Sequence, residues 1–120
     1  MSADRKVAIK VLEETGSVII RCNGNSMRPL IAPQEAIHLR KVDPSLLRVG
    51  DAVFCRIKGA LQVHLLTAID AKNQRYEISN NHDFRNGDIG PQSIFGLCVQ
   101  VEDRVFVSEQ DLVERAKSIQ

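Results

Sequence analysis

The sequence predicts a β-rich α+β fold: a curled antiparallel sheet or a small complex β-barrel, with a short helix at each terminus. Many short apolar runs alternate with turn residues, which is typical of antiparallel strands. Helical periodicity is confined to the two ends of the chain. The 120 residues contain no linker or repeat, so we expect one domain. It divides into an N-terminal helix over 1–16, a β core over 17–107 and a C-terminal helix over 108–120.

Apolar residues recur at helical spacing near both ends of the chain. The first such stripe predicts an amphipathic helix over 3–15, and Gly16 is a suitable residue to end it. Near the other end, Ser108 and Asp111 form a Ser-x-x-Asp capping pattern. The stripe that begins at Leu112 then predicts the C-terminal helix.

The segments between the helices are predicted to be strands because they are rich in β-branched residues and are bounded by turn residues. Gly59 and Ala60 separate two of these runs and indicate a hairpin. The polar segment over 80–90 shows no periodicity, and we expect it to be a loop. The expected strands cover residues 17–22, 36–42, 52–58, 61–69, 75–79, 95–101 and 104–107.

Composition excludes several functional classes. A formal net charge of +1 and the absence of Trp argue against nucleic-acid binding, which needs a clustered basic face or aromatic stacking platforms. No run reaches the roughly 18 apolar residues of a spanning helix, and the charged N-terminus is unlike a secretory signal. The scattered cysteines Cys22, Cys55 and Cys98 are typical of reduced thiols in a cytoplasmic protein. We expect no metal and no cofactor.

A serine in a forced turn is the first candidate for catalysis. Ser26 follows an apolar extended run, and Pro29 stiffens the chain just after it. Gly24 allows a sharp turn and close approach of a substrate, and the Ser26 backbone N–H is a candidate donor to an oxyanion. The alternative interpretation is a polar turn at the end of a strand, with Met27 merely filling the core.

A serine hydroxyl needs a base, and His64 is the first candidate. It lies within a predicted strand, which is a rigid platform, and an imidazole pKa near 6.5 suits proton transfer at neutral pH. His38 and His82 are competitors: the first lies in another strand, the second in the polar loop. A histidine in a strand is also commonly a structural residue, so this alternative stays open.

The segment over 24–29, which reads Gly-Asn-Ser-Met-Arg-Pro, resembles the nucleophile box of the signal-peptidase and SOS-repressor (LexA-like) serine protease superfamily. Further boxes similar to those of the family follow in its order. They are Leu47 to Val53, Val63-His64, Ser79-Asn80-Asn81 with Asp83 or Asp88 after it, and Ile94 to Val99. The resemblance covers about residues 17–101 and implies the fold predicted above.

The resemblance also implies roles for individual residues. Ser26 would be the nucleophile, His64 the general base, and Asp83 or Asp88 the carboxylate that orients His64. The residues implied to form the substrate and oxyanion region are Gly24, Asn25, Met27 and Asn80. The chain departs from the family pattern in two of these: Asn80 stands where the family has Asp, and Gly24 where bacterial signal peptidases have a hydroxyl.

The resemblance implies a soluble serine endopeptidase that removes a leader or propeptide from a protein precursor in the cytoplasm. Its partner would be that peptide or precursor, with no transmembrane segment and no nucleic acid. The alternative is an inactive family member that binds peptides or serves as a dimerisation module. Exposed strand edges could also pair with a second copy of the chain to give a homodimer.

Overall fold

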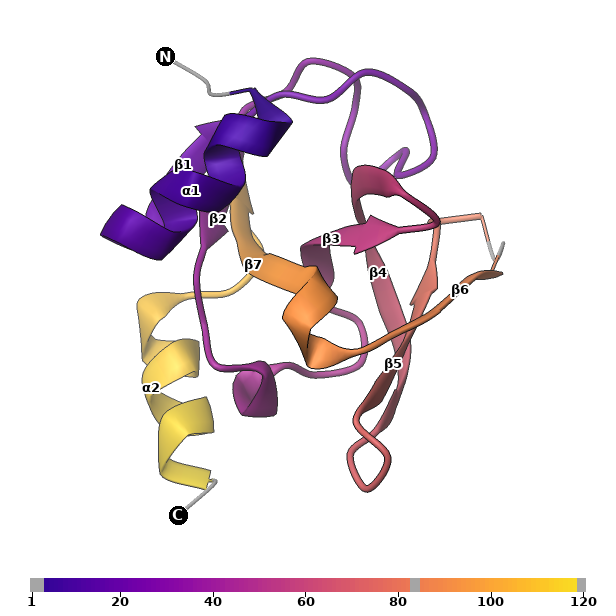
Figure 1. Ribbon diagram of the computed structural model, residues 1–120. Helices are drawn as coiled ribbons and strands as arrows, with labels where there is room; N and C mark the ends of the chain where they lie inside the picture. Colours follow the sequence, from indigo (N-terminus) through magenta and orange to yellow (C-terminus); the bar gives the residue numbers. More distant parts are fainter. Residues whose placement is uncertain (1–3, 83–84, 119–120) are drawn as a thin grey trace.

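The computed structural model describes residues 4–82 and 85–118. They form an antiparallel eight-stranded sheet with one helix near each terminus (Figure 1). Its main path runs β1-β2-β7-β3-β4-β5-β6, with β8 paired to β7. Within the described residues β1 and β6 do not pair, so the sheet is curled but not closed. The β-rich fold with terminal helices is confirmed, and of the two forms expected the structure has the curled sheet.

The predicted elements occur in the expected order, most of them shorter than predicted, whereas β4 and β7 are longer and β6 is additional. The elements are α1 (Arg5–Thr15), β1 (Ser17–Ile20), β2 (Ile37–Arg40), η1 (Pro44–Leu46), β3 (Ala52–Ile57), β4 (Ala60–Asp70), β5 (Arg75–Ser79), β6 (Arg85–Ile89), η2 (Pro91–Ser93), β7 (Ile94–Val101), β8 (Arg104–Val105) and α2 (Glu109–Ser118). None of the helices among the described residues has the length and apolarity needed to cross a membrane.

Helix α1 begins and ends where its sequence provides caps. The Asp4 side chain accepts a hydrogen bond from the Lys6 N–H at the start. Gly16 ends the helix in the left-handed region, with φ 87°, as predicted. The buried Leu12 packs against Gly96 of β7, where an added Cβ would lie 3.2 Å from the Leu12 Cδ1. The absence of a side chain at Gly96 therefore lets α1 lie close to the sheet.

Strand β3 has a core on both of its faces. Successive side chains of a strand point to opposite faces, and Ala52 and Phe54 belong to one apolar cluster while Val53 and Cys55 belong to the other. Helix α1 contributes Ala8 and Leu12 to the first cluster, and α2 contributes Leu112 to the second. The two helices thus pack on two different apolar clusters of the curled sheet.

Two boundaries in the β core differ from the sequence prediction. The β3–β4 turn is formed by Lys58 and Gly59, not by Gly59 and Ala60, because both turn residues have positive φ, 51° and 80°. The segment over 80–90 was expected to be a loop, yet Arg85–Ile89 forms the edge strand β6 on β5. Its polar, glycine-containing sequence, Arg-Asn-Gly-Asp-Ile, has no apolar alternation because much of it is not buried.

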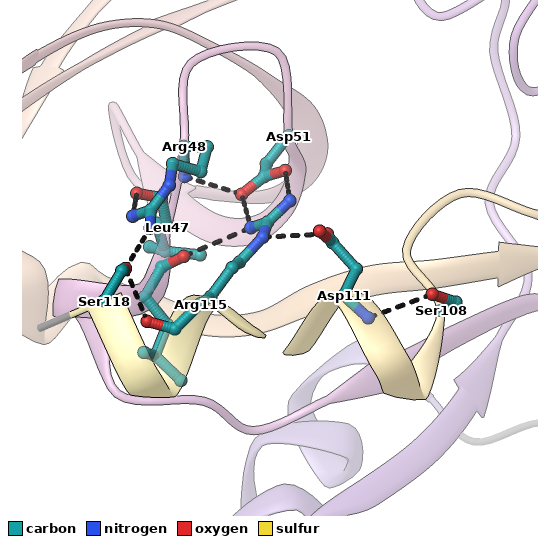
Figure 2. A network of polar contacts seen from close by, with 8 residues as sticks. Leu47, Arg48, Asp51, Ser108, Asp111, Arg115 and Ser118 are labelled. Atoms are coloured by element: carbon teal, nitrogen blue, oxygen red, sulfur yellow. Dashed lines mark hydrogen bonds and ion pairs between the residues drawn. The ribbon is translucent and has the colours of Figure 1, made fainter. Parts of the chain in front are cut away.

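Helix α2 is held on the sheet by a largely buried ion pair (Figure 2). Its N-terminus is capped as predicted, with the Ser108 Oγ accepting from the Asp111 N–H at 3.0 Å. Arg115 donates to both carboxylate oxygens of Asp51, at 2.7 and 3.0 Å. The Asp51 backbone carbonyl in turn accepts from the N–H of Leu66 in β4. Arg115 therefore fastens α2 to the turn that adjoins β4.

Candidate active site

Ser26 lies in the irregular connection between β1 and β2. Gly24 adopts φ 99°, a left-handed conformation that glycine tolerates best, and so turns the chain just before the serine. Met27 and Ile31 are buried in the first apolar cluster, and the Ile31 N–H donates to the Met27 carbonyl. The apolar anchors after Ser26 fix the loop on the sheet while the serine itself remains partly exposed.

A second loop, over 80–82, holds the serine loop in place. The Asn81 N–H donates to the Ser26 carbonyl at 2.9 Å, and the Asn81 side-chain amide donates to the Arg28 carbonyl at 2.9 Å. His82 Nε2 lies 3.1 Å from the Asn25 carbonyl oxygen and donates to it, since a carbonyl can only accept. His82, a competitor for the role of base, is thus a structural donor to the backbone beside Ser26.

The imidazole of His64 projects from β4 toward Ser26. His64 is paired with Val53 of β3, so the sheet fixes its backbone on a central strand (Figure 1). Its Nε2 lies 3.0 Å from the Ser26 Oγ, although the two residues are 38 positions apart in the sequence. The structure therefore brings together the two residues on which the sequence-based hypothesis depends, at the distance of a hydrogen bond.

Burial of His64 keeps its imidazole in the form that a base requires. The residue is 6% exposed, and this burial lowers its pKa from the ordinary 6.5, while the Asn86 side chain acts in the opposite direction. At neutral pH the imidazole is therefore uncharged. A neutral imidazole carries one proton and one lone pair on its two ring nitrogens. When the proton lies on Nδ1, the Nε2 that faces Ser26 carries the lone pair and accepts a hydrogen bond from the serine hydroxyl.

Ser26 and His64 face an open pocket of about 430 Å³. Its lining contains apolar side chains such as Ile37 and Val63 and amides such as Gln62. Arg5 of α1 reaches its rim, where a guanidinium N–H donates to the Leu61 carbonyl at 2.8 Å. No carboxylate lines the pocket among the residues that the structure describes. The site can accommodate an extended peptide segment with both apolar and polar groups.

The two aspartates predicted to orient His64 have different outcomes. Asp83 lies outside the described residues. Asp88 is exposed on β6, opposite Glu77, and its carboxylate accepts from Arg85 at 2.7 Å. The prediction that Asp88 orients His64 is therefore not in agreement with the structure, because this carboxylate is engaged with an arginine on the outer face.

A residue that the sequence analysis missed, Asn86, lies beside His64 instead. The β5–β6 register pairs Ile78 with Gly87 and Ser79 with Arg85, which leaves Asn86 as the extra residue of a β-bulge. A bulge disturbs the alternation of side chains and can redirect one of them. Asn86 lines the pocket. Asn-Gly in a polar segment is a turn signal, so nothing in the sequence pattern pointed to this residue.

The other residues predicted for the site lie around Ser26 in varied roles. The Asn25 side chain accepts from Arg28 at 2.6 Å, and Met27 is buried in the core while it also lines the pocket. Asn80 lines the pocket, and its side chain accepts from the His82 N–H at 2.8 Å. The Ser26 N–H makes no hydrogen bond to another described residue and so is available as an oxyanion donor.

Cys22 is less buried than the two other cysteines. Cys55 and Cys98 are buried, and their burial raises the pKa of each thiol to about 12. Cys22 lines the pocket near Ser26, where burial also raises its pKa. No three metal-binding side chains cluster within the described part of the chain.

In comparisons with known proteins, neither a protein-family model nor a curated protein matches the chain.

Proposed function

We propose that the protein is a serine endopeptidase that uses Ser26 as nucleophile and His64 as general base. The observation that carries this proposal is the 3.0 Å separation of the Ser26 Oγ and the His64 Nε2 at the wall of an open pocket. Structural histidines commonly bond backbone carbonyls or carboxylates; an imidazole aimed at a partly exposed serine on a tight loop has the arrangement of an activated nucleophile.

The residues suit acyl transfer. His64 Nε2 takes the hydroxyl proton as the Ser26 Oγ attacks the peptide carbonyl carbon, and the Ser26 N–H, which bonds no other described residue, serves as an oxyanion donor. The imidazolium then gives its proton to the leaving amine, which leaves an acyl ester on Ser26. His64 next takes a proton from water as the water oxygen attacks the ester. The imidazolium returns this proton to the Ser26 Oγ as the ester bond breaks, and the acid product ionises to a free carboxylate. Electrons and protons balance without a cofactor.

The substrate we propose is an extended segment of a protein precursor, such as a leader or propeptide in the cytoplasm. The pocket is open and has mixed apolar and amide walls, which suits a peptide better than a small charged ligand. The outer edges of β1 and β6 pair with no further strand among the residues described, which leaves room for a second copy of the chain and would give a homodimer.

A covalent serine probe tests the nucleophile. A biotinylated fluorophosphonate should label the wild-type protein on Ser26, as located by peptide mass spectrometry, and labelling should vanish in Ser26→Ala. His64→Ala should slow labelling by about a hundredfold or more, because general-base catalysis contributes at least that factor. Ser108→Ala provides a control serine substitution away from the pocket and should label at the wild-type rate.

The same experiment separates the peptidase from an inactive peptide-binding module. Wild-type protein that is folded but remains unlabelled would overturn the enzyme and leave the binding module. The pH dependence gives a second check: because the folded pKa of His64 lies below 6.5, labelling should fall only as the pH drops below that value. A rate that rises only toward pH 9 would point to a different base.

A further inference from the structure

Two buried polar atoms at the site have no partner. The Nδ1 of His64 and the Oδ1 of Asn86 are both inaccessible to solvent, and neither makes a hydrogen bond within the described residues. An unpaired buried donor or acceptor carries the full penalty of losing its hydrogen bonds to water, so two of them in one site call for an explanation. The two belong to neighbouring side chains, since the Asn86 amide acts on the pKa of His64.

The two atoms are complementary. When Nε2 accepts the Ser26 proton, the imidazole proton lies on Nδ1, which is then a donor. The Oδ1 of Asn86 is an acceptor. Hydrogen bonds of catalytic groups are often long or poorly aligned before substrate binds and shorten in the complex. A small movement of the Asn86 side chain would therefore satisfy both atoms at once.

We infer that Asn86 is the positioning residue of this site: its amide oxygen accepts the Nδ1–H of His64 and holds Nε2 toward Ser26. The inference rests on the proposed function and extends it to a Ser-His-Asn arrangement. The β-bulge at Asn86 provides the structural reason, because it turns this side chain inward while Arg85 and Asp88 pair with each other on the outer face.

An amide in this place has a consequence that a carboxylate would not have. A carboxylate stabilises the imidazolium and raises its pKa, whereas a neutral amide orients the ring with little effect of this kind. The other titratable or charged groups that line the pocket, among the described residues, are Arg5 from α1 and Cys22 after β1. A cation and a neutral thiol do not replace the missing carboxylate. Burial therefore keeps the base uncharged in mildly acidic solution, and Asn86 orients the ring without the large opposing effect of a carboxylate.

The decisive variants are Asn86→Leu and Asn86→Asp, read by the rate of fluorophosphonate labelling of Ser26 and by the pH dependence of that rate. Leu has nearly the same size but no acceptor, and it should slow labelling about tenfold or more. Asp keeps the acceptor and adds a charge, so it should retain activity and move the acidic limb up by about one to three pH units. Asn73→Leu, in the β4–β5 turn, is the matched control and should change neither.

Imidazole nitrogen chemical shifts provide a readout that does not depend on labelling. Wild-type His64 should carry its proton on Nδ1, and Asn86→Leu should shift the population toward the Nε2 tautomer. Wild-type protein with the proton on Nε2, or an Asn86→Asp variant with an unmoved acidic limb, would overturn the role of Asn86 even if Ser26 is labelled. Absence of labelling in the wild type would instead overturn the proposed function.

Discussion

The buried ion pair between Asp51 and Arg115 allows a sharp test of how α2 is attached. Their side chains are 6% and 11% exposed, and Arg115 also donates to the Leu46 carbonyl at 3.1 Å. Arg115→Met keeps most of the side-chain volume but leaves the Asp51 carboxylate buried without its counter-charge. Removing one member of a buried pair typically costs about 3–5 kcal/mol.

The lower end of that range applies here. The Asp51 carboxylate still accepts from the Arg48 N–H at 2.7 Å, so part of its hydrogen bonding survives. We expect Arg115→Met to lower the free energy of unfolding by about 3 kcal/mol, or roughly 10–15 °C in Tm for a chain of this size. The chain lacks Trp, so urea unfolding is best followed by far-UV circular dichroism.

Lys117→Met on the same helix is the matched control. Lys117 pairs with Glu114 at 3.6 Å, but both side chains are mostly exposed, and such pairs contribute less than about 1 kcal/mol. In an Asp51→Asn background, Arg115→Met should cost much less than in the wild type, because no buried charge is left uncompensated. Equal small losses for Arg115→Met and Lys117→Met would refute the attachment of α2 through Asp51.

Three further outcomes are expected. Ser108→Ala should lower the free energy of unfolding by about 1 kcal/mol, since it removes the cap on the Asp111 N–H; an unchanged urea midpoint would contradict this. Arg104 lowers the pKa of Glu35 from 4.5 to about 2. The pair therefore stabilises the fold above pH 4.5, and this contribution to stability disappears as the pH falls toward 2. Glu35→Gln should flatten that part of the plot of stability against pH. Gly87→Ala should destabilise the fold by about 1–3 kcal/mol through backbone strain at φ 143°, and wild-type stability would show that the β6 backbone relaxes.

Local sequence patterns were sufficient to predict much of the fold. Helix ends are determined by short-range hydrogen bonds, so Gly16 and Ser108 could be read directly from the sequence. Strand β6 was missed because an edge strand with polar residues has neither alternation nor a continuous apolar run. The hairpin turn was displaced by one residue because Lys58 has positive φ, a conformation that the sequence pattern does not favour.

The part of the candidate site that motif residues form could be predicted from the sequence. The part that depends on the strand register between β5 and β6 could not. The proximity of Ser26 and His64 was expected from the order of the motif boxes, and the structure places the two side chains together. Asn86 was missed and Asp88 misplaced for one reason: a bulge in the β5–β6 pairing decides which side chain of β6 faces His64. A single inserted residue in a ladder leaves no trace in the hydrophobic pattern.

The serine loop is held by the buried side chains of Met27 and Ile31 and by hydrogen bonds that Asn81 and His82, in a second loop, make to its backbone. His64, by contrast, belongs to a strand paired on both sides. Irregular surface segments open at a lower free energy than central strands. Low concentrations of urea should therefore abolish covalent labelling of Ser26 while the circular dichroism spectrum is still native, so that loss of labelling would precede denaturation.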